Sequence, residues 1–288
     1  MLQPRRSAFV FLFSKRQLLI VSMLVVLIFP GRILAQSQFL NHWLDNVART
    51  QDEQPHWISP LILNTPRLEQ KFRADFSRQV LPDHSTIWSY GNGKGLDIMP
   101  YKNIALILDL PPYLQHSAPD TQDGLGDVSF LIKYRIMAAN EDHGNYILTA
   151  YLGGSVPTGT YKNGSNSAQI LPTLAGGKGW GNFSLQSTLG GTLPVDSTRI
   201  VGRSIVWNCS AQWHIERYLW PELGSNNTYF LEGPSDGKTQ NFLTPGLLLG
   251  RIPLRHHLGL SLGAGMQIAT SRDPLYNHAL ILTGRIPF

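Results

Sequence analysis

Residues 124–160 constrain the fold of this chain more than any other stretch, because apolar side chains alternate there with polar or small ones. The alternation runs through residues 128–136, stops at a polar gap at 139–144, and resumes at 146–155. A period of two is typical of a β-strand, and a short polar gap between two such runs indicates a hairpin. The sequence therefore predicts an antiparallel pair of strands with one apolar face and one charged or small face.

Strands with two such faces fit either a soluble sandwich with one wet side or a membrane barrel with lipid outside and a polar interior. Most candidate strands in this chain approach or exceed the roughly 9–11 residues that cross a bilayer when tilted, whereas strands in globular proteins are usually about 5–6 residues long. This length favours the membrane barrel. The segments that carry the pattern are 68–78, 86–90, 104–110, 128–136, 146–155, 180–193, 204–214, 219–223, 242–252, 256–268 and 279–288.

The number of strands follows from the need to close the barrel. An open edge in lipid leaves backbone groups unpaired, and single-chain bacterial barrels use even strand counts. The eleven segments therefore predict an all-β fold, a transmembrane antiparallel up-and-down β-barrel of about twelve strands, with ten as the alternative. We expect the missing strand near residues 94–99 or 226–232, and we expect a long polar loop at residues 161–179.

The N-terminus predicts export. Residues 1–35 have the pattern of a secretory signal peptide, because basic side chains precede an apolar run at 18–29 that a Pro-Gly pair ends. An N-terminal transmembrane anchor is the alternative, but the run is short for the about 20 residues that span a bilayer. Residues 36–66 are expected to form a periplasmic or plug-like irregular lead-in, with a short helix at 39–49, before a barrel at 67–288.

Charge and cysteine content agree with an exported chain. Residues 1–35 contain five basic and no acidic side chains, so their removal lowers the formal net charge from +5 to 0. The sequence pI of 9.3 therefore gives no reason to expect a nucleic-acid partner. Cys209 is the sole cysteine, so the fold cannot depend on an intrachain disulfide.

The chain ends on Phe288, at the close of the alternating strand 279–288. A terminal aromatic residue on an amphipathic strand is typical of an outer-membrane assembly signal. Together with the signal peptide it predicts location in the outer membrane of a Gram-negative-type bacterium, with outer-membrane lipid and the barrel assembly machinery as partners. Tyr and Trp residues near strand ends, such as Tyr134, Trp180 and Trp213, suit aromatic girdles at the membrane interfaces.

Four motifs carry a family resemblance. They are residues 124–135 (GLGDVSFLIKYR), 155–159 (SVPTG), 176–181 (GGKGWG) and 243–246 (LTPG). Through them the chain is similar, over roughly residues 68–288, to the outer-membrane family named for the MetA pathway of phenol degradation. The resemblance implies a barrel that takes up small compounds, including hydrophobic or aromatic ones. The motifs indicate the fold more specifically than the substrate.

A porin-like channel or transporter for passive uptake is the leading functional hypothesis, because the polar strand faces would line the lumen. Lys133 and Arg135 would place two positive charges on one wall, and Glu222 and Asp109 are expected to oppose them. The partner would be a small-molecule solute, with no cofactor or metal. The alternative is a non-conducting structural barrel whose interior is closed by salt bridges. The pore-lining candidates are Asp109, Lys133, Arg135, Asn182, Gln186, Gln212, His214, Glu222, Gln267 and Arg285.

An outer-membrane lipid-modifying enzyme is the third hypothesis, and the sequence favours it least. A hydrolase needs a nucleophile and a base in contact. Ser210 and His214 share a phase, but on one strand they would lie about 13 Å apart. The chain contains no G-x-S-x-G or H-E-x-x-H motif, and His256 and His257 would point to opposite strand faces. We therefore predict that the protein is not an enzyme.

Overall fold

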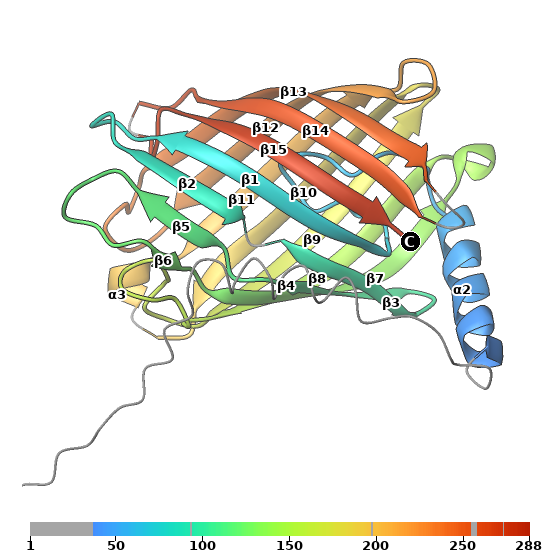
Figure 1. Ribbon diagram of the computed structural model, residues 1–288, viewed down its shortest axis with the longest axis horizontal. Coiled ribbons are helices and arrows are strands. Elements are labelled where there is room, and N and C mark those ends of the chain that lie inside the picture. Colours follow the sequence, from blue (N-terminus) through green and yellow to red (C-terminus); the bar gives the residue numbers. More distant parts are fainter. Residues whose placement is uncertain (1–36, 93, 197, 255–257, 273) are drawn as a thin grey trace, which may run out of the picture. The chain divides into compact units, whose positions relative to one another are not determined.

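The computed structural model describes residues 37–92, 94–196, 198–254, 258–272 and 274–288 (Figure 1). The expected signal peptide at residues 1–35 lies outside the described residues. The first described element is helix α2 (Ser37–Asp52), which covers the short helix expected at 39–49. Within the described ranges, no helix has the length and apolar character needed to cross a membrane. From Asp45 onward the chain forms one compact unit.

That unit is a closed antiparallel β-barrel (Figure 1). Each strand pairs with its neighbours in the sheet, and β1 pairs with β15 to close it. Two short helices, Glu141–His143 and α3 (Thr198–Val201), lie in the connections. The strands are β1 (Lys71–Val80), β2 (Thr86–Gly91), β3 (Gly95–Tyr101), β4 (Ile104–Asp109), β5 (Tyr113–His116), β6 (Gly124–Leu125), β7 (Val128–Ala139), β8 (Tyr146–Val156), β9 (Gln169–Trp180), β10 (Phe183–Pro194), β11 (Ser204–Trp213), β12 (Leu219–Phe230), β13 (Thr239–Pro253), β14 (Gly259–Ala269) and β15 (His278–Pro287).

The barrel has twelve strands, as the even-count argument predicts. Three of them are interrupted, because β2 continues into β3, β4 into β5, and β6 into β7 without a reversal of direction. Pro111 and Pro112 lie in the second interruption, where they cannot donate to a sheet ladder. The ten-strand alternative is therefore wrong.

The missing strand is not where the sequence pattern suggested. Residues 94–99 fall in β3, which continues β2, and residues 226–232 largely extend β12. The twelfth strand is β9, which occupies much of the stretch 161–179 that we expected to be a loop. Three glycines and Pro172 interrupt its apolar alternation, so a strand that pairs along its whole length has a weak sequence pattern.

The predicted faces of the strands are confirmed. On β7 the apolar phase, including Ile132 and Tyr134, is exposed on the outside, while Lys133 and Arg135 are buried inside. On β14, Met266 faces out and the other phase faces in. The longer connections gather at one end of the barrel, and the shorter turns gather at the other, beside the C-terminus (Figure 1). We call these the long-loop end and the short-turn end.

The interior of the barrel contains residues 53–70, which we call the inner segment. Apart from a turn and bends it has no regular secondary structure, and most of its residues are buried. Trp57, Ile58 and Leu61 of this segment form an apolar cluster with Trp220 and Leu248 of the wall, along with one residue of β8. The main buried apolar cluster of the molecule therefore lies between the inner segment and the barrel wall.

Candidate functional site

The candidate site is the lumen with its inner segment. An irregular segment cannot pair its own backbone groups, so buried carbonyl groups need partners from elsewhere. Here the polar side chains of the wall supply hydrogen bonds to those carbonyls. The wall residues that donate to them are Arg73, Lys133, Thr149, Tyr151, Gln186, Asn226, Arg251 and Arg285.

Inward-facing glycines leave room for the side chains of this segment. A Cβ atom added to Gly224 on β12 would lie 2.5 Å from Ile62 Cδ1, and one on Gly177 would lie 2.5 Å from the Trp57 ring. Distances this short cannot be tolerated without a shift of the neighbour. The glycines of these strands therefore fit a lumen that is filled by chain rather than by water.

Lys133 is fully enclosed in this arrangement. Its Nζ donates to the carbonyl oxygens of Thr65 at 2.9 Å and Arg67 at 3.3 Å, and it lies 5.3 Å from the centroid of the Tyr151 ring. The Tyr151 hydroxyl donates to the same Thr65 oxygen at 2.6 Å. The wall charge that the sequence suggested is present, but in this structure it contacts the inner segment.

Arg135 and Glu53 connect the start of the inner segment to the short-turn end. Arg135 donates to the Thr50 carbonyl at 2.9 Å and to Glu53 at 3.1 Å, and Lys102 forms an ion pair with Glu53 at 2.7 Å. The hydrogen bond from Lys102 lowers the pKa of Glu53 below its usual value, with burial opposing and Arg135 adding to the effect. Glu53 is therefore ionised and paired at neutral pH.

A second contact at this end joins His56 to Glu141, in the turn between β7 and β8. The His56 backbone N–H donates to Glu141 at 2.7 Å, and the imidazole Nδ1 lies 2.7 Å from the other carboxylate oxygen. Burial acts to raise the pKa of Glu141, but these hydrogen bonds outweigh it and lower that pKa.

Gln186, Gln212 and Glu222 form a continuous hydrogen-bonded chain across β10, β11 and β12. Gln186 donates to Gln212 at 3.0 Å, and Gln212 donates to Glu222 at 2.9 Å. The chain meets the inner segment at both ends, because Thr65 donates to Gln186 and the Leu61 N–H donates to Glu222. These three candidates lie together in the lumen, as their shared strand phase indicated.

The other candidates are dispersed. Arg285 is buried and donates to the Ser59 and Pro60 carbonyls. Gln267 donates to Asn226 at 2.7 Å, nearer the long-loop end. Asp109 accepts from Ser129 at 3.2 Å.

Two candidates lie outside the strands, and one expected pairing is not made. Asn182 is exposed in the turn between β9 and β10, and the His214 ring follows β11 and stacks on Trp220 at a centroid distance of 4.0 Å. Among the described residues, neither Glu222 nor Asp109 forms an ion pair with Lys133 or with Arg135.

Sequence reasoning missed several charged residues of the site. Arg67 forms an ion pair with Glu69 at 2.8 Å, and Arg73 forms one with Asp75 at 2.7 Å. The charged phase of residues 69–77 is unusually dense, but it fits a solvated strand face as well as a water-filled lumen, so the sequence did not assign these residues to the site. The sequence pattern also did not indicate a lumen position for Arg251, because this residue lies in a nearly continuous apolar run, 242–252, whose strand phase is ambiguous.

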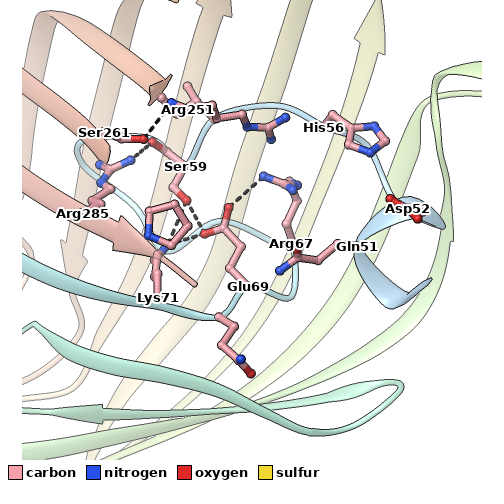
Figure 2. A pocket seen from close by; sticks show the side chains of 13 residues that line it. Gln51, Asp52, His56, Ser59, Arg67, Glu69, Lys71, Arg251, Ser261 and Arg285 are labelled. Carbon is pink, nitrogen blue, oxygen red and sulfur yellow. Dashed lines mark hydrogen bonds and ion pairs between the residues drawn. The ribbon is translucent and has the colours of Figure 1, made fainter. Parts of the chain in front are cut away.

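Two cavities open beside the inner segment at the short-turn end. One, of about 230 Å³, is lined by Arg67, Glu69, Lys71 and Arg285, among others (Figure 2). The second, of about 370 Å³, is lined by Trp57, His214 and Trp220, among others. His56 and Arg251 line both cavities.

Two kinds of catalytic arrangement are relevant to the enzymatic hypothesis, a metal cluster and the pair Ser210 and His214. No group of three His, Cys, Asp or Glu side chains within the described residues could bind a metal ion. Ser210 is fully buried, and its hydroxyl has no hydrogen-bond partner in the described part of the chain. His214 lies just after the end of β11, the strand that carries Ser210, and among the described residues its side chain forms no hydrogen bond with Ser210.

The family model with the description "Putative MetA-pathway of phenol degradation" matches residues 73–250, which is more than half of the chain. The chain belongs to this family. Comparison with curated proteins finds no match.

Comparison with solved structures finds one that resembles the MetA-pathway family protein in fold and others with a weaker match. An outer membrane channel from Pseudomonas putida F1 is 15% identical, with a TM-score of 0.54, over 81% of this chain and 100% of that one. OmpT, an outer membrane protein of Vibrio cholerae folded in vitro as a trimer, is 9% identical, with a TM-score of 0.33, over 76% of this chain and 98% of its own. The first likeness supports the outer-membrane type of barrel fold.

Proposed function

We propose that this MetA-pathway family protein is an outer-membrane channel for small solutes, whose lumen is occupied by its own inner segment in the state described. The observation that carries the proposal is the way in which the lumen is filled. Polar side chains around the wall contact one continuous segment through its backbone carbonyls, in addition to the contacts that some wall side chains make with one another. Displacing that single segment would leave a continuous polar passage.

The contacts suit a segment that can leave. Hydrogen bonds to backbone carbonyls can exchange for hydrogen bonds to water, and each contributes about 0.5–1.5 kcal/mol net when the donor is neutral and about 1.5–3 kcal/mol when it is charged, as for Lys133 and Arg285. The apolar part of the contact includes the cluster around Trp57, Ile58 and Leu61, and Leu63 and Leu68 are also buried. Lys133 and Gln186, which contact the segment here, would then face water, as expected of pore-lining residues.

The fold gives the direction of the proposed passage. Bacterial barrels have short periplasmic turns and longer extracellular loops. The short-turn end would therefore face the periplasm, and the inner segment would enter the lumen from that side. The family description and the named activity of the Pseudomonas putida relative support a channel for small compounds, and we extend this to hydrophobic or aromatic solutes.

The test is planar-bilayer conductance of refolded protein. We expect the full-length chain to conduct rarely, and a variant that lacks residues 53–66 to conduct steadily. A variant that lacks only residues 37–44, and so keeps the inner segment, is the matched control and should behave as the full-length chain. Heat-modifiable mobility on gels would establish that each variant is folded, and fractionation of cells would establish outer-membrane location.

A folded deletion variant without conductance would overturn the channel and favour a structural barrel. Recovery of the wild-type protein in the soluble periplasmic fraction would overturn the location. Hydrolysis of phospholipid by the full-length protein, abolished by Ser210→Ala, would establish the enzymatic alternative.

A further inference from the structure

Arg251 is turned toward the lumen by a local distortion of β13. The pairing of β13 with β14 shifts between Leu249 and Ile252, and Arg251 has a φ of +60°. A β-bulge redirects side chains, and a left-handed φ is an uncommon conformation for a non-glycine residue. By simple alternation Arg251 would follow Leu247 and Leu249 to the outside. Instead its guanidinium donates to the carbonyl of Trp57 in the lumen at 2.9 Å.

A second guanidinium converges on the same atom. Arg67 Nη1 also donates to the Trp57 carbonyl, so two cationic groups share one neutral acceptor. The nearest carboxylate is that of Glu69, which already contacts Arg67, Lys71 and the Ser59 hydroxyl. Like charges this close repel one another unless an anion lies between them or beside them.

The whole cavity has a surplus of positive charge. Arg67, Lys71, Arg251 and Arg285 line it, against Glu69 and the exposed Asp52 (Figure 2). Arg285 is buried and donates its guanidinium hydrogens to the Ser59 and Pro60 carbonyls and the Thr283 hydroxyl, and it forms no ion pair with any described carboxylate.

The cavity also contains polar groups without partners. Arg67 is 5% exposed, and its Nε donates to nothing in the described part of the molecule. Gln70 is 1% exposed, lines the same cavity, and has no partner among the described residues at either side-chain polar atom. Unpaired buried polar groups cost free energy, and a bound ligand can supply the missing partners.

The adjoining cavity has aromatic rings in its lining, together with polar residues that include Glu141 and Arg217. Trp57 lines it with Trp220, on which the His214 ring stacks at 4.0 Å with an interplanar angle of 9°. The indole Nε1 of Trp57 is buried and has no acceptor in the described ranges. Arg251 lines both cavities, so a ligand could place an anionic group on the arginines and a flat apolar body against the aromatic rings.

We propose that the two cavities at the short-turn end form one binding site for a small organic carboxylate with a flat apolar body. Arg251 and Arg67 bind the carboxylate, and Trp57 and Trp220 contact the body. A carboxylate fits because the planar guanidinium presents paired donors that match its two oxygens. Binding of the carboxylate does not depend on the proposed function. Its passage through the channel as a solute does rest on that function.

The experiment is isothermal titration calorimetry on full-length protein in detergent, with benzoate as the probe. Benzyl alcohol, of similar size and shape but uncharged, is the matched ligand. We expect saturable binding of benzoate, and binding of benzyl alcohol at least tenfold weaker, because it lacks charge-assisted hydrogen bonds. Arg251→Gln should weaken benzoate binding by tenfold or more, and Arg67→Gln should do the same. Arg251 is the better position, because it lines both cavities and its substitution removes one hydrogen bond to the Trp57 carbonyl, which Arg67 still contacts.

Arg203→Gln, which changes an exposed arginine at the long-loop end, is the control variant and should bind as the wild type does. Absence of benzoate binding, equal binding of the two probes, or unchanged affinity in a folded Arg251→Gln variant would each overturn the inference. Calorimetry needs no transport, so it tests the site separately from the channel. If the variant lacking residues 53–66 conducts but the full-length chain does not bind benzoate, the site alone is rejected. If the full-length chain binds benzoate but no variant conducts, the channel alone is rejected.

Discussion

Lys133→Met tests whether the wall charges keep the inner segment in the lumen. Methionine retains most of the side-chain volume and removes the ammonium group. In the structure that group donates to the Thr65 and Arg67 carbonyls. The barrel strands on either side of β7 do not depend on it, since their pairing is made by backbone groups.

The size of the effect follows from those two contacts. A hydrogen bond from a charged donor contributes about 1.5–3 kcal/mol net. The Thr65 carbonyl keeps the Tyr151 hydroxyl as a partner, whereas the Arg67 carbonyl has no second donor among the described contacts. The change should therefore weaken the association of the inner segment by about 2–3 kcal/mol, which raises the population with a free lumen by about 30- to 150-fold.

The assay is the frequency of opening events in planar bilayers. Lys162→Met, in an exposed long-loop connection, removes the same charge away from the lumen and is the control. We expect frequent openings of Lys133→Met and wild-type behaviour of Lys162→Met. If Lys133→Met stays as closed as the wild type while the chain lacking residues 53–66 conducts, then Lys133 does not retain the segment and the reasoning from its contacts is refuted.

Three further predictions concern assembly, orientation and pH. Deleting Phe288 should lower insertion into the outer membrane without affecting export; an unchanged membrane yield with unchanged heat-modifiable mobility would contradict this. Ile132→Arg, on the outer face, should lower the free energy of unfolding by about 2–4 kcal/mol near the membrane midplane, whereas Ser129→Arg, beside the inward Asp109 carboxylate, should lower it much less. Equal unfolding midpoints of the two variants in denaturant would argue against strands in a bilayer. The pKa of Glu53 is lowered in the folded protein, so its contacts stabilise the bound inner segment above the unfolded pKa, and this stabilisation is lost as pH falls through the lower folded value. The frequency of opening should therefore rise in acid. Glu53→Gln should open more often at neutral pH and lose this acid dependence, and a pH profile unchanged by the substitution would reject the role of Glu53.

The barrel and its two faces could be read from the sequence alone. Alternation with a period of two is a local property, so Ile132 and Lys133 go to opposite faces whatever the rest of the chain does. Strand length and closure then predict a membrane barrel of about twelve strands. The same logic placed Gln186, Gln212 and Glu222 in the lumen, because their phase on each strand is unambiguous.

Tertiary structure alone decided what fills that lumen. The inner segment has no period, since an irregular chain obtains its hydrogen bonds from side chains far away in sequence, such as Lys133 and Arg285. Strand β9 also escaped detection, because backbone pairing with two neighbours stabilises it despite its glycines. Arg251 faces inward through a bulge that depends on its register with β14. Partners, register and occupancy are non-local, and a local pattern cannot specify them.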